Sequence, residues 1–240
     1  MPDSVPAVAS LLVLWDVDYT LADTDGVGRL GYELAFAEMF GTKPPSMPSM
    51  AGRTDHAIAL EALRLAGVPD PHSVVAAFVQ SLARQAPAVA ELARARGRAL
   101  PGAAEALAAL AVTRHLQVVQ SVLTGNVRPM AEVKLAAVGL LEHLDLEAGA
   151  YGEVSERRAD LVELARRNAA ERYAADFSGP ATVLVGDTPF DVEAALLTGA
   201  RAVGVATGRF AGPELAEAGA HVVLPDLTDT GAVLAAILSG

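Results

Sequence analysis

The chain has 240 residues, of which 52% are apolar and 20% are charged, and its formal net charge is −11 at pH 7. This composition supports a large core and excludes a disordered chain, and the length fits one α/β unit with an insertion or two small domains. The excess of acid argues against nucleic acid or an anionic membrane as the main partner, since phosphate groups are bound by clustered Lys and Arg.

Cys is absent from the chain, which excludes disulfides, zinc–thiolate sites and a thiol nucleophile. No apolar run reaches the roughly 18 residues that a membrane span needs. The stretch Met1–Ser10 holds two prolines, Asp3 and no basic residue, so it does not look like a secretory signal. We therefore expect a cytoplasmic protein without a membrane partner.

Short apolar runs alternate along the chain with longer segments of helical periodicity, which favours a parallel sheet covered by helices. The expected strands are, in chain order, 11–15, 116–123, 144–147, 181–185, 202–205 and 221–224. The helices expected between and after them are 103–111, 127–138, 158–174, 190–198, 213–218 and 231–238. The pattern predicts an α/β fold with a doubly wound, Rossmann-like parallel sheet.

The first gap is different, because it shows helical patterns and no convincing strand between Leu21 and Leu100. A loop rich in Gly and Pro, residues 41–48, separates the first two of these helical segments. Pro101 and Gly102 suit a turn before the next helix. The helices expected in the gap are 28–40, 55–66 and 71–96. We predict an α-helical cap domain, residues 22–100, inserted into a core made of residues 1–21 and 101–240.

Two acids, Asp16 and Asp18, follow directly after the first apolar run. Acids two residues apart on extended backbone point the same way and can share one cation, and open α/β sheets bind ligands beyond the carboxyl ends of their strands. Two carboxylates this close raise one another's pKa unless a positive charge lies between them, and Mg²⁺ prefers oxygen ligands. Alone, the pair would also fit a turn with solvated side chains.

Polar residues follow three later strands as well. Thr124 offers a hydroxyl group, and Gly125 beside it lets a backbone N–H approach an anion closely. Arg157 and Arg158 lie near a helix start, where a cation opposes the helix dipole unless an anion binds there. The expected strand 181–185 runs into a turn at Gly186 and Asp187, and a second acid, Asp191, follows four residues after Asp187.

An acid pair, a Thr, a cation and a Gly-Asp turn follow successive expected strands. In this order they resemble the sequence motifs of the haloacid dehalogenase-like hydrolase superfamily, over about residues 11–210. Asp16–Leu21 match its first motif, Asp-x-Asp-x-Thr followed by Leu, and Gly186–Asp191 match its fourth motif. Thr124 takes the place of the second motif. Most members of the family carry Gly where this chain has Tyr19, and the difference bears on the width of the pocket for the leaving group.

The third motif of the family is a Lys or Arg at the start of the following helix. Arg157 and Arg158 both qualify, and we favour Arg158 because it directly precedes the apolar helical pattern that begins at Leu161. Lys134 is the weaker candidate, because it follows Thr124 by only ten residues.

The resemblance implies a Mg²⁺-dependent phosphatase that hydrolyses a small phosphorylated metabolite through an aspartyl-phosphate. Asp16 would be the nucleophile, and Asp18 would act first as the acid and then as the base. Mg²⁺ would be held by Asp16, by the backbone carbonyl of Asp18 and by Asp187. Asp191 would position this cluster from behind.

The resemblance also implies a set of residues that bind the phosphoryl group or the substrate. In the cap, Arg53 is a candidate for reading the substrate, although it is equally an Arg beside a helix N-cap at Thr54. The implied core residues are Val17, Thr124, Gly125, Asn126 and Arg158.

Several alternatives stay open from the sequence. A phosphomutase would use the same core residues, and a non-catalytic binding protein could keep the fold without turnover. A dehalogenase fits less well because of Asp18, and a phosphonatase would need a cap Lys, for which only Lys43 is available. Gly26, Gly28 and Gly31 have the spacing of a dinucleotide site but do not follow a strand, so we interpret them as a hinge of the cap.

Overall fold

The computed structural model describes residues 9–239. Residues 1–8 and 240 lie outside the described part, and with them most of the N-terminal stretch for which we expect no signal. Among the described residues, no helix combines the length and the apolar character that crossing a membrane requires.

Within the described residues, the main sheet has six parallel strands: β1 (Ser10–Trp15), β4 (Gln117–Thr124), β5 (Ala150–Tyr151), β6 (Thr182–Gly186), β7 (Arg201–Val205) and β8 (Val222–Leu224). They lie in the order β5-β4-β1-β6-β7-β8. From β1 the chain first builds outward through β4 and β5, and then returns to build the other half from β6. The predicted doubly wound α/β sheet is confirmed, and its order reverses between β1 and β6, where such sheets bind their ligands.

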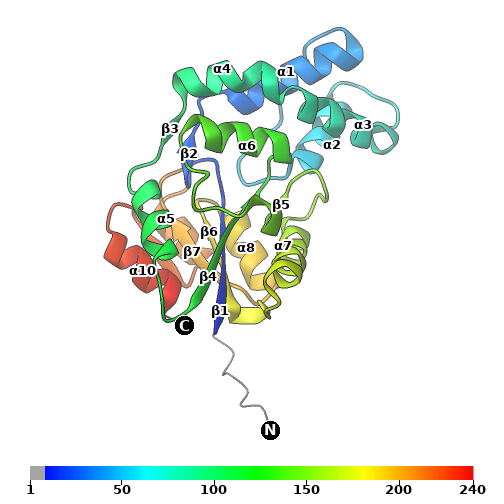
Figure 1. The fold of residues 1–240 in the computed structure, drawn as a ribbon. Helices are drawn as coiled ribbons and strands as arrows, with labels where there is room; N and C mark the ends of the chain where they lie inside the picture. The colour runs from blue at the N-terminus through cyan, green and yellow to red at the C-terminus, as the bar shows by residue number, and fades with distance from the viewer. Residues whose placement is uncertain (1–8, 240) are drawn as a thin grey trace.

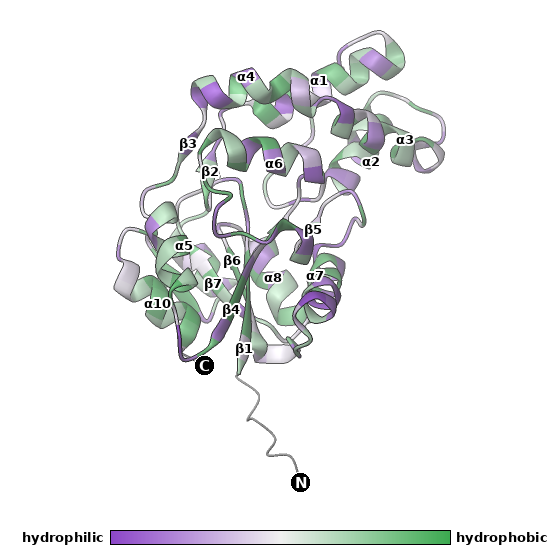
Figure 2. Cartoon of the chain, viewed as in Figure 1, coloured by the Kyte–Doolittle hydropathy of each residue, from purple (hydrophilic) through white to green (hydrophobic). Residues whose placement is uncertain are grey.

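Helices cover both faces of the sheet (Figure 1). On one face Leu11, Val13 and Trp15 of β1 pack in a common core with three helices, α5 (Ala103–Ala111), α6 (Arg128–Ala137) and α10 (Thr230–Leu238). On the other face Leu12 and Leu14 pack against α7 (Arg158–Tyr173), α8 (Pro189–Leu197) and α9 (Gly212–Glu217). Because both faces of the sheet are covered, the sequence of β1 is a continuous apolar run. Figure 2 shows that α5 and α10, which cover one of these faces, are predominantly hydrophobic.

Four helices form a separate layer beyond the carboxyl ends of the strands (Figure 1): α1 (Val27–Phe40), α2 (Asp55–Leu65), α3 (Pro71–Arg84) and α4 (Ala86–Arg96). They have a core of their own, which includes Tyr32, Phe36 and Phe78. Val127 and Met130, at the start of α6, belong to this second core, so α6 packs against both layers. The exact boundary of the cap, residues 22–100, stays a prediction.

Three expectations for individual elements are wrong. The segment 144–147 is not a strand, because it ends in a 3-10 turn at Leu146–Ala148, and the paired strand is β5 just after it. The segment 71–96 is two helices that separate at Gln85, because Pro87 lacks the N–H that a continuous helix needs. The first gap does contain strands, since β2 (Ala22–Asp23) pairs with β3 (Arg98–Ala99) where the chain leaves the core and returns.

The helical layer is docked on the core by backbone contacts at the start of α2. The N–H of Asp55 donates to the carbonyl of Gly125 at 2.6 Å, and the N–H of His56 donates to the carbonyl of Gly152 at 2.9 Å. A Cβ on Gly125 would lie 2.0 Å from the carbonyl oxygen of Arg53, and one on Gly152 would lie 2.9 Å from the backbone nitrogen of Asp55. Only glycine allows the two layers to approach this closely at these positions.

Candidate active site

The ends of β1 and β6 bring two of the predicted acids side by side. The N–H of Asp16 donates to the carbonyl of Val185 at 2.9 Å, which aligns the first residue after β1 with the end of β6. Asp187 directly follows β6. Both acids therefore lie at the point where the strand order reverses.

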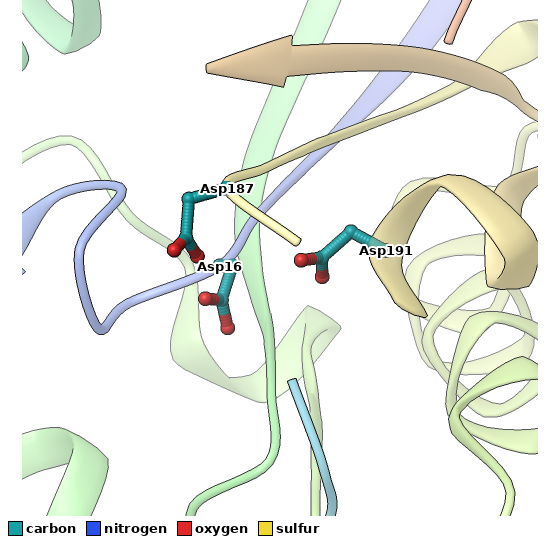
Figure 3. Close-up of side chains that lie close together, drawn as sticks. All are labelled: Asp16, Asp187 and Asp191. Carbon is teal, nitrogen blue, oxygen red and sulfur yellow. The ribbon is translucent and has the colours of Figure 1, made fainter. Parts of the chain in front are cut away.

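A third acid reaches the same place from α8. Asp191 lies in the first turn of this helix, where Thr188 caps the N-terminus and the Asp191 carboxylate accepts from the Thr188 N–H at 3.1 Å. Figure 3 shows the side chains of Asp16, Asp187 and Asp191 converging, and each offers an oxygen within 4.8 Å of the others. The side chains are buried, with only 6%, 2% and 1% of their residue surface exposed, respectively.

Arg158 is the cation of this cluster. Its Nη2 atom donates to Oδ1 of Asp16 at 2.6 Å and to the carbonyl of Leu123 at 3.1 Å. The same Nη2 atom lies 2.6 Å from Oδ1 of Asp191, an ion pair without the angles of a hydrogen bond. Arg157, its neighbour and the rival candidate, is exposed and makes no contact with the acids among the described residues. The structure thus places Arg158, the favoured of the two, on the first acid.

Two carboxyl groups of the cluster, those of Asp16 and Asp187, have strongly raised pKa values. Burial raises the pKa of Asp187 to about 9, and the nearby Asp16 and Asp191 add to this shift. Burial likewise raises the pKa of Asp16 to about 7, although Arg158 opposes the shift. The single guanidinium of Arg158 therefore does not offset the desolvation and repulsion that favour the neutral forms of Asp16 and Asp187.

The residues of the cluster fit a divalent cation. Oδ1 of Asp187 is buried without a hydrogen-bond partner, and a buried acceptor without a partner is costly. Carboxylate oxygens are the ligands that hard divalent ions prefer. Gly208 closes the other side, because a Cβ there would lie 1.7 Å from Oδ2 of Asp187. Sequence reasoning missed Gly208, since only the fold brings the segment after β7 against Asp187.

Asp18 is separated from the other acids by its partners. Nζ of Lys134 lies 2.7 Å from both carboxylate oxygens of Asp18, and Nδ2 of Asn126 donates to Oδ2 at 2.7 Å. The Asp18 side chain is 35% exposed, whereas the Lys134 side chain is 4% exposed. The side chain of Asp18 therefore does not join the Asp16–Asp187–Asp191 cluster, and Lys134, the candidate we favoured least, is a second cation of the site.

The loop after β4 carries the other predicted residues. Oγ1 of Thr124 accepts from Nδ2 of Asn126 at 2.7 Å and from its backbone N–H at 3.2 Å. Thr124, Gly125 and Asn126 all line the cavity over the acids. Val17 does not line it, because its side chain is buried in the core below and its carbonyl accepts from Leu21 and Ala22.

Arg53 reaches the same cavity from the helical layer, but its guanidinium is engaged elsewhere. It pairs with Glu61 and donates to the carbonyls of Ser49 and Ala57. Thr54 beside it is the N-cap of α2, as the sequence allows. The structure therefore brings Arg53 to the edge of the site without pointing its charge at the acids among the described contacts.

A cavity of about 360 Å³ lies between the acids and the helical layer. Tyr19 is one of its lining residues, with 43% of its surface exposed and with a left-handed φ of 59°. Gly26 and Gly28, at the start of α1, also line the cavity. The cavity is thus large enough for a small metabolite, and a tyrosine lines it where the resembled family mostly has glycine.

Asp55, which sequence reasoning missed, is a buried acid where the two layers meet. Its Oδ2 atom accepts from the N–H of Val127 at 2.7 Å, and Oδ1 accepts from the hydroxyl of Tyr32 at 3.0 Å. Burial raises the pKa of Asp55 to about 6, and the Val127 N–H and Lys134 oppose this shift. The carboxyl group ties α2 to the start of α6.

Comparisons with known proteins agree with this architecture. A family model described as haloacid dehalogenase-like hydrolase matches residues 13–196. A hydrolase from Pseudomonas syringae shares 22% identity and a TM-score of 0.64, over 92% of this chain and 95% of that chain. A predicted phosphatase from Clostridium acetobutylicum shares 17% identity and a TM-score of 0.64, over 94% and 99%.

A provisionally assigned beta-phosphoglucomutase from Bacteroides vulgatus shares 15% identity and a TM-score of 0.62, over 98% of this chain and 91% of that chain. At these identities the likeness concerns the fold. The comparison with curated proteins gave no match.

The left-handed backbone of Tyr19 predicts a difference between two substitutions. Tyr19→Gly and Tyr19→Ala both remove the ring, but only glycine adopts this φ without strain. We expect the glycine variant to be more stable than the alanine variant by about 1 kcal/mol. This is the lower end of the free-energy penalty that a non-glycine residue incurs in a left-handed conformation. Urea unfolding measures the difference, and an alanine variant of equal or greater stability would contradict it.

The raised pKa of Asp187 predicts a pH dependence of stability in the presence of a chelator. Because its folded pKa lies above the unfolded value, its stabilising contribution is complete at low pH and is lost as pH rises through the folded pKa. From about pH 4 to about pH 9, we expect the unfolding free energy of the wild type to fall relative to Asp187→Asn. The fall should exceed about 1.4 kcal/mol, the equivalent of one pKa unit.

The control for this measurement is Asp70→Asn, which changes an exposed helix N-cap to another good N-cap residue. Its stability should run parallel to that of the wild type over the same pH range. If the stability of Asp187→Asn also runs parallel to that of the wild type, the pKa of Asp187 is not raised in the folded protein, and the prediction is contradicted.

Proposed function

This chain belongs to the haloacid dehalogenase-like hydrolases, and we propose that it is a Mg²⁺-dependent phosphomonoester hydrolase that acts on a small phosphorylated metabolite. The observation that carries the proposal is the separation of two acids that are neighbours in sequence. Asp16 lies in the carboxylate cluster with Arg158, while Asp18 lines the cavity and forms an ion pair with Lys134. Two different environments suit two different chemical roles.

In the proposed reaction a carboxylate oxygen of Asp16 attacks the phosphorus atom of the ester. The new bond joins Asp16 to phosphorus, and the bond between phosphorus and the leaving oxygen breaks. Asp18, which must be protonated at this step, donates its proton to that oxygen and becomes a carboxylate, so the product leaves as an alcohol. A water molecule then attacks the aspartyl-phosphate and gives its proton to Asp18, which releases inorganic phosphate and restores both acids.

Mg²⁺ would be held by Asp16, Asp187 and the backbone carbonyl of Asp18, with Asp191 supporting the cluster through Arg158 and Thr188. The ion would supply positive charge where the anionic nucleophile meets the anionic phosphoryl group. The unpartnered oxygen of Asp187 and the raised pKa values of Asp16 and Asp187 support this assignment. Without a cation, Asp16 would be a weak nucleophile at neutral pH because a large share of it would be protonated.

The phosphoryl oxygens would be bound by groups that face Asp16. Arg158 already holds one oxygen of Asp16 and has a buried Nε atom without a hydrogen-bond partner. Thr124 and Gly125, which line the cavity, would add a hydroxyl group and a backbone N–H. These donors are held by the sheet and its loops, so little reorganisation is needed as charge develops.

Hydrolysis of 4-nitrophenyl phosphate tests the proposal. We expect wild-type protein to release phosphate with Mg²⁺ and not with chelator, and Asp16→Asn to lose the activity because the amide is a poor nucleophile. Asp70→Asn is the matched control, since it makes the same chemical change at an exposed position. Release that persists in Asp16→Asn would contradict the proposal, and conversion of a sugar phosphate without release would indicate a mutase.

The role of Asp18 predicts a separation of rate from metal binding. Asp18→Ala should lower kcat by roughly 10²–10⁴-fold, the usual contribution of a general acid–base group. The affinity for Mg²⁺ should change little, because the Asp18 side chain lies outside the carboxylate cluster. Steady-state kinetics and calorimetric titration with Mg²⁺ measure the two quantities, and a near-normal rate would refute the assigned role.

A further inference from the structure

Lys134 stands out as a buried cation that the resembled motifs do not use. It lies in the second half of α6, and only 4% of its side chain is exposed. The chain has one other lysine, Lys43, which is exposed and pairs with Glu33. Burying an ammonium group costs free energy unless the group is fully paired. A buried lysine that lines the cavity is therefore a candidate for a functional role.

All the hydrogen-bonding capacity of Lys134 is used within the site. Its Nζ atom lies 2.7 Å from Oδ1 and Oδ2 of Asp18 and 2.7 Å from Oδ1 of Asn126. An ammonium group has three N–H donors, so these three acceptors saturate it. It therefore has no donor left for a substrate while Asp18 keeps this orientation.

Asn126 completes a closed network around the same carboxylate. Its Nδ2 atom donates to Oδ2 of Asp18 and to Oγ1 of Thr124, at 2.7 Å each, while its Oδ1 accepts from Lys134. The carboxylate of Asp18 is thus fixed by Lys134 on both oxygens and by Asn126 on one. Charge-assisted contacts of this length hold a side chain in one orientation.

The backbone that carries Lys134 is itself firmly held. Val127 and Met130, in the preceding turns, are buried in the core of the helical layer. Ala131 and Leu135, on the neighbouring face of α6, are buried in the core under the sheet. The helix is packed on both sides, so the position of Nζ is set by two cores and not by a flexible loop.

We propose that Lys134, together with Asn126, is a positioning residue that holds the side chain of Asp18 in place, so that Asp18 in its protonated form can give its proton to the leaving group. The inference rests on the proposed phosphatase function and adds to it a residue that acts on Asp18 alone. Arg158 serves Asp16 and the phosphoryl group, whereas Lys134 makes no contact with the Asp16–Asp187–Asp191 cluster among the described residues. The site thus has one cation for each of its two reacting acids.

The test compares two substrates that differ in their need for an acid. Departure of 4-nitrophenolate from 4-nitrophenyl phosphate needs no proton, whereas departure of the alkoxide from glycerol 2-phosphate does. The value of kcat/KM covers only the steps through departure of the leaving group, so it reports the acid role without the later attack of water. The variants are Lys134→Met and Asn126→Ala, with Lys43→Met as the matched control for loss of a lysine.

We expect Lys134→Met to lower kcat/KM for glycerol 2-phosphate by about 10²-fold, within the range of general acid–base catalysis, and to leave kcat/KM for the aryl phosphate nearly unchanged. Asn126→Ala should show the same selectivity with a smaller effect, because Lys134 still holds both oxygens of Asp18. Asp18→Ala should show the same selectivity at least as strongly. Lys43→Met should behave as the wild type on both substrates.

Three results would overturn the inference. Equal losses of kcat/KM on the two substrates, with a raised KM, would mean that Lys134 binds the phosphoryl group. Unchanged kinetics in a Lys134→Met variant that is shown to be folded by thermal unfolding would mean that Lys134 contributes only to packing and not to catalysis. If wild-type protein has no turnover of either phosphate that depends on Asp16, the proposed function fails, and the role of Lys134 fails with it.

Discussion

The concentration of buried negative charge beside a single guanidinium is the constraint on which the rest of the site depends. Asp16, Asp187 and Asp191 share one small volume with Arg158, and burial raises the pKa of both Asp16 and Asp187. A fold does not keep such an arrangement for stability, because a buried acid without full compensation costs free energy. A bound cation would resolve the conflict, and the cluster that would hold it is closed on one side by Gly208, where a Cβ would lie 1.7 Å from Oδ2 of Asp187.

The second constraint is the separation of two acids that are only two residues apart. Asp16 contacts Arg158, while Asp18 contacts Lys134 and Asn126. In the proposed reaction this division would keep one acid with the metal ligands and leave the other, 35% exposed, free to exchange protons with substrate and water. The helical layer contributes to it directly, because it packs on α6, the helix that carries Lys134.

Much of the core and its acids could be predicted from the sequence, because parallel strands buried on both faces read as apolar runs and their ends meet at one edge. The three elements placed wrongly depended on weaker signals, such as the two-residue strand β5, which is held by pairing with β4 and not by its own pattern. The spacing of Lys134 from Thr124 argues against it as a site residue, but spacing along the chain does not reveal that two turns of helix bring its side chain to Asp18. Gly208 and Asp55 likewise matter only through contacts across the fold.

The most direct measurement is a crystal structure of the protein grown with Mn²⁺, an oxygen-binding divalent ion whose anomalous scattering locates it unambiguously. The account predicts an ion bound by the carboxylates of Asp16 and Asp187, with the side chain of Asp18 still held by Lys134. A cluster that stays free of the ion while Mn²⁺ binds elsewhere, or an ion bound through the side chain of Asp18, would contradict the division of roles on which the account rests.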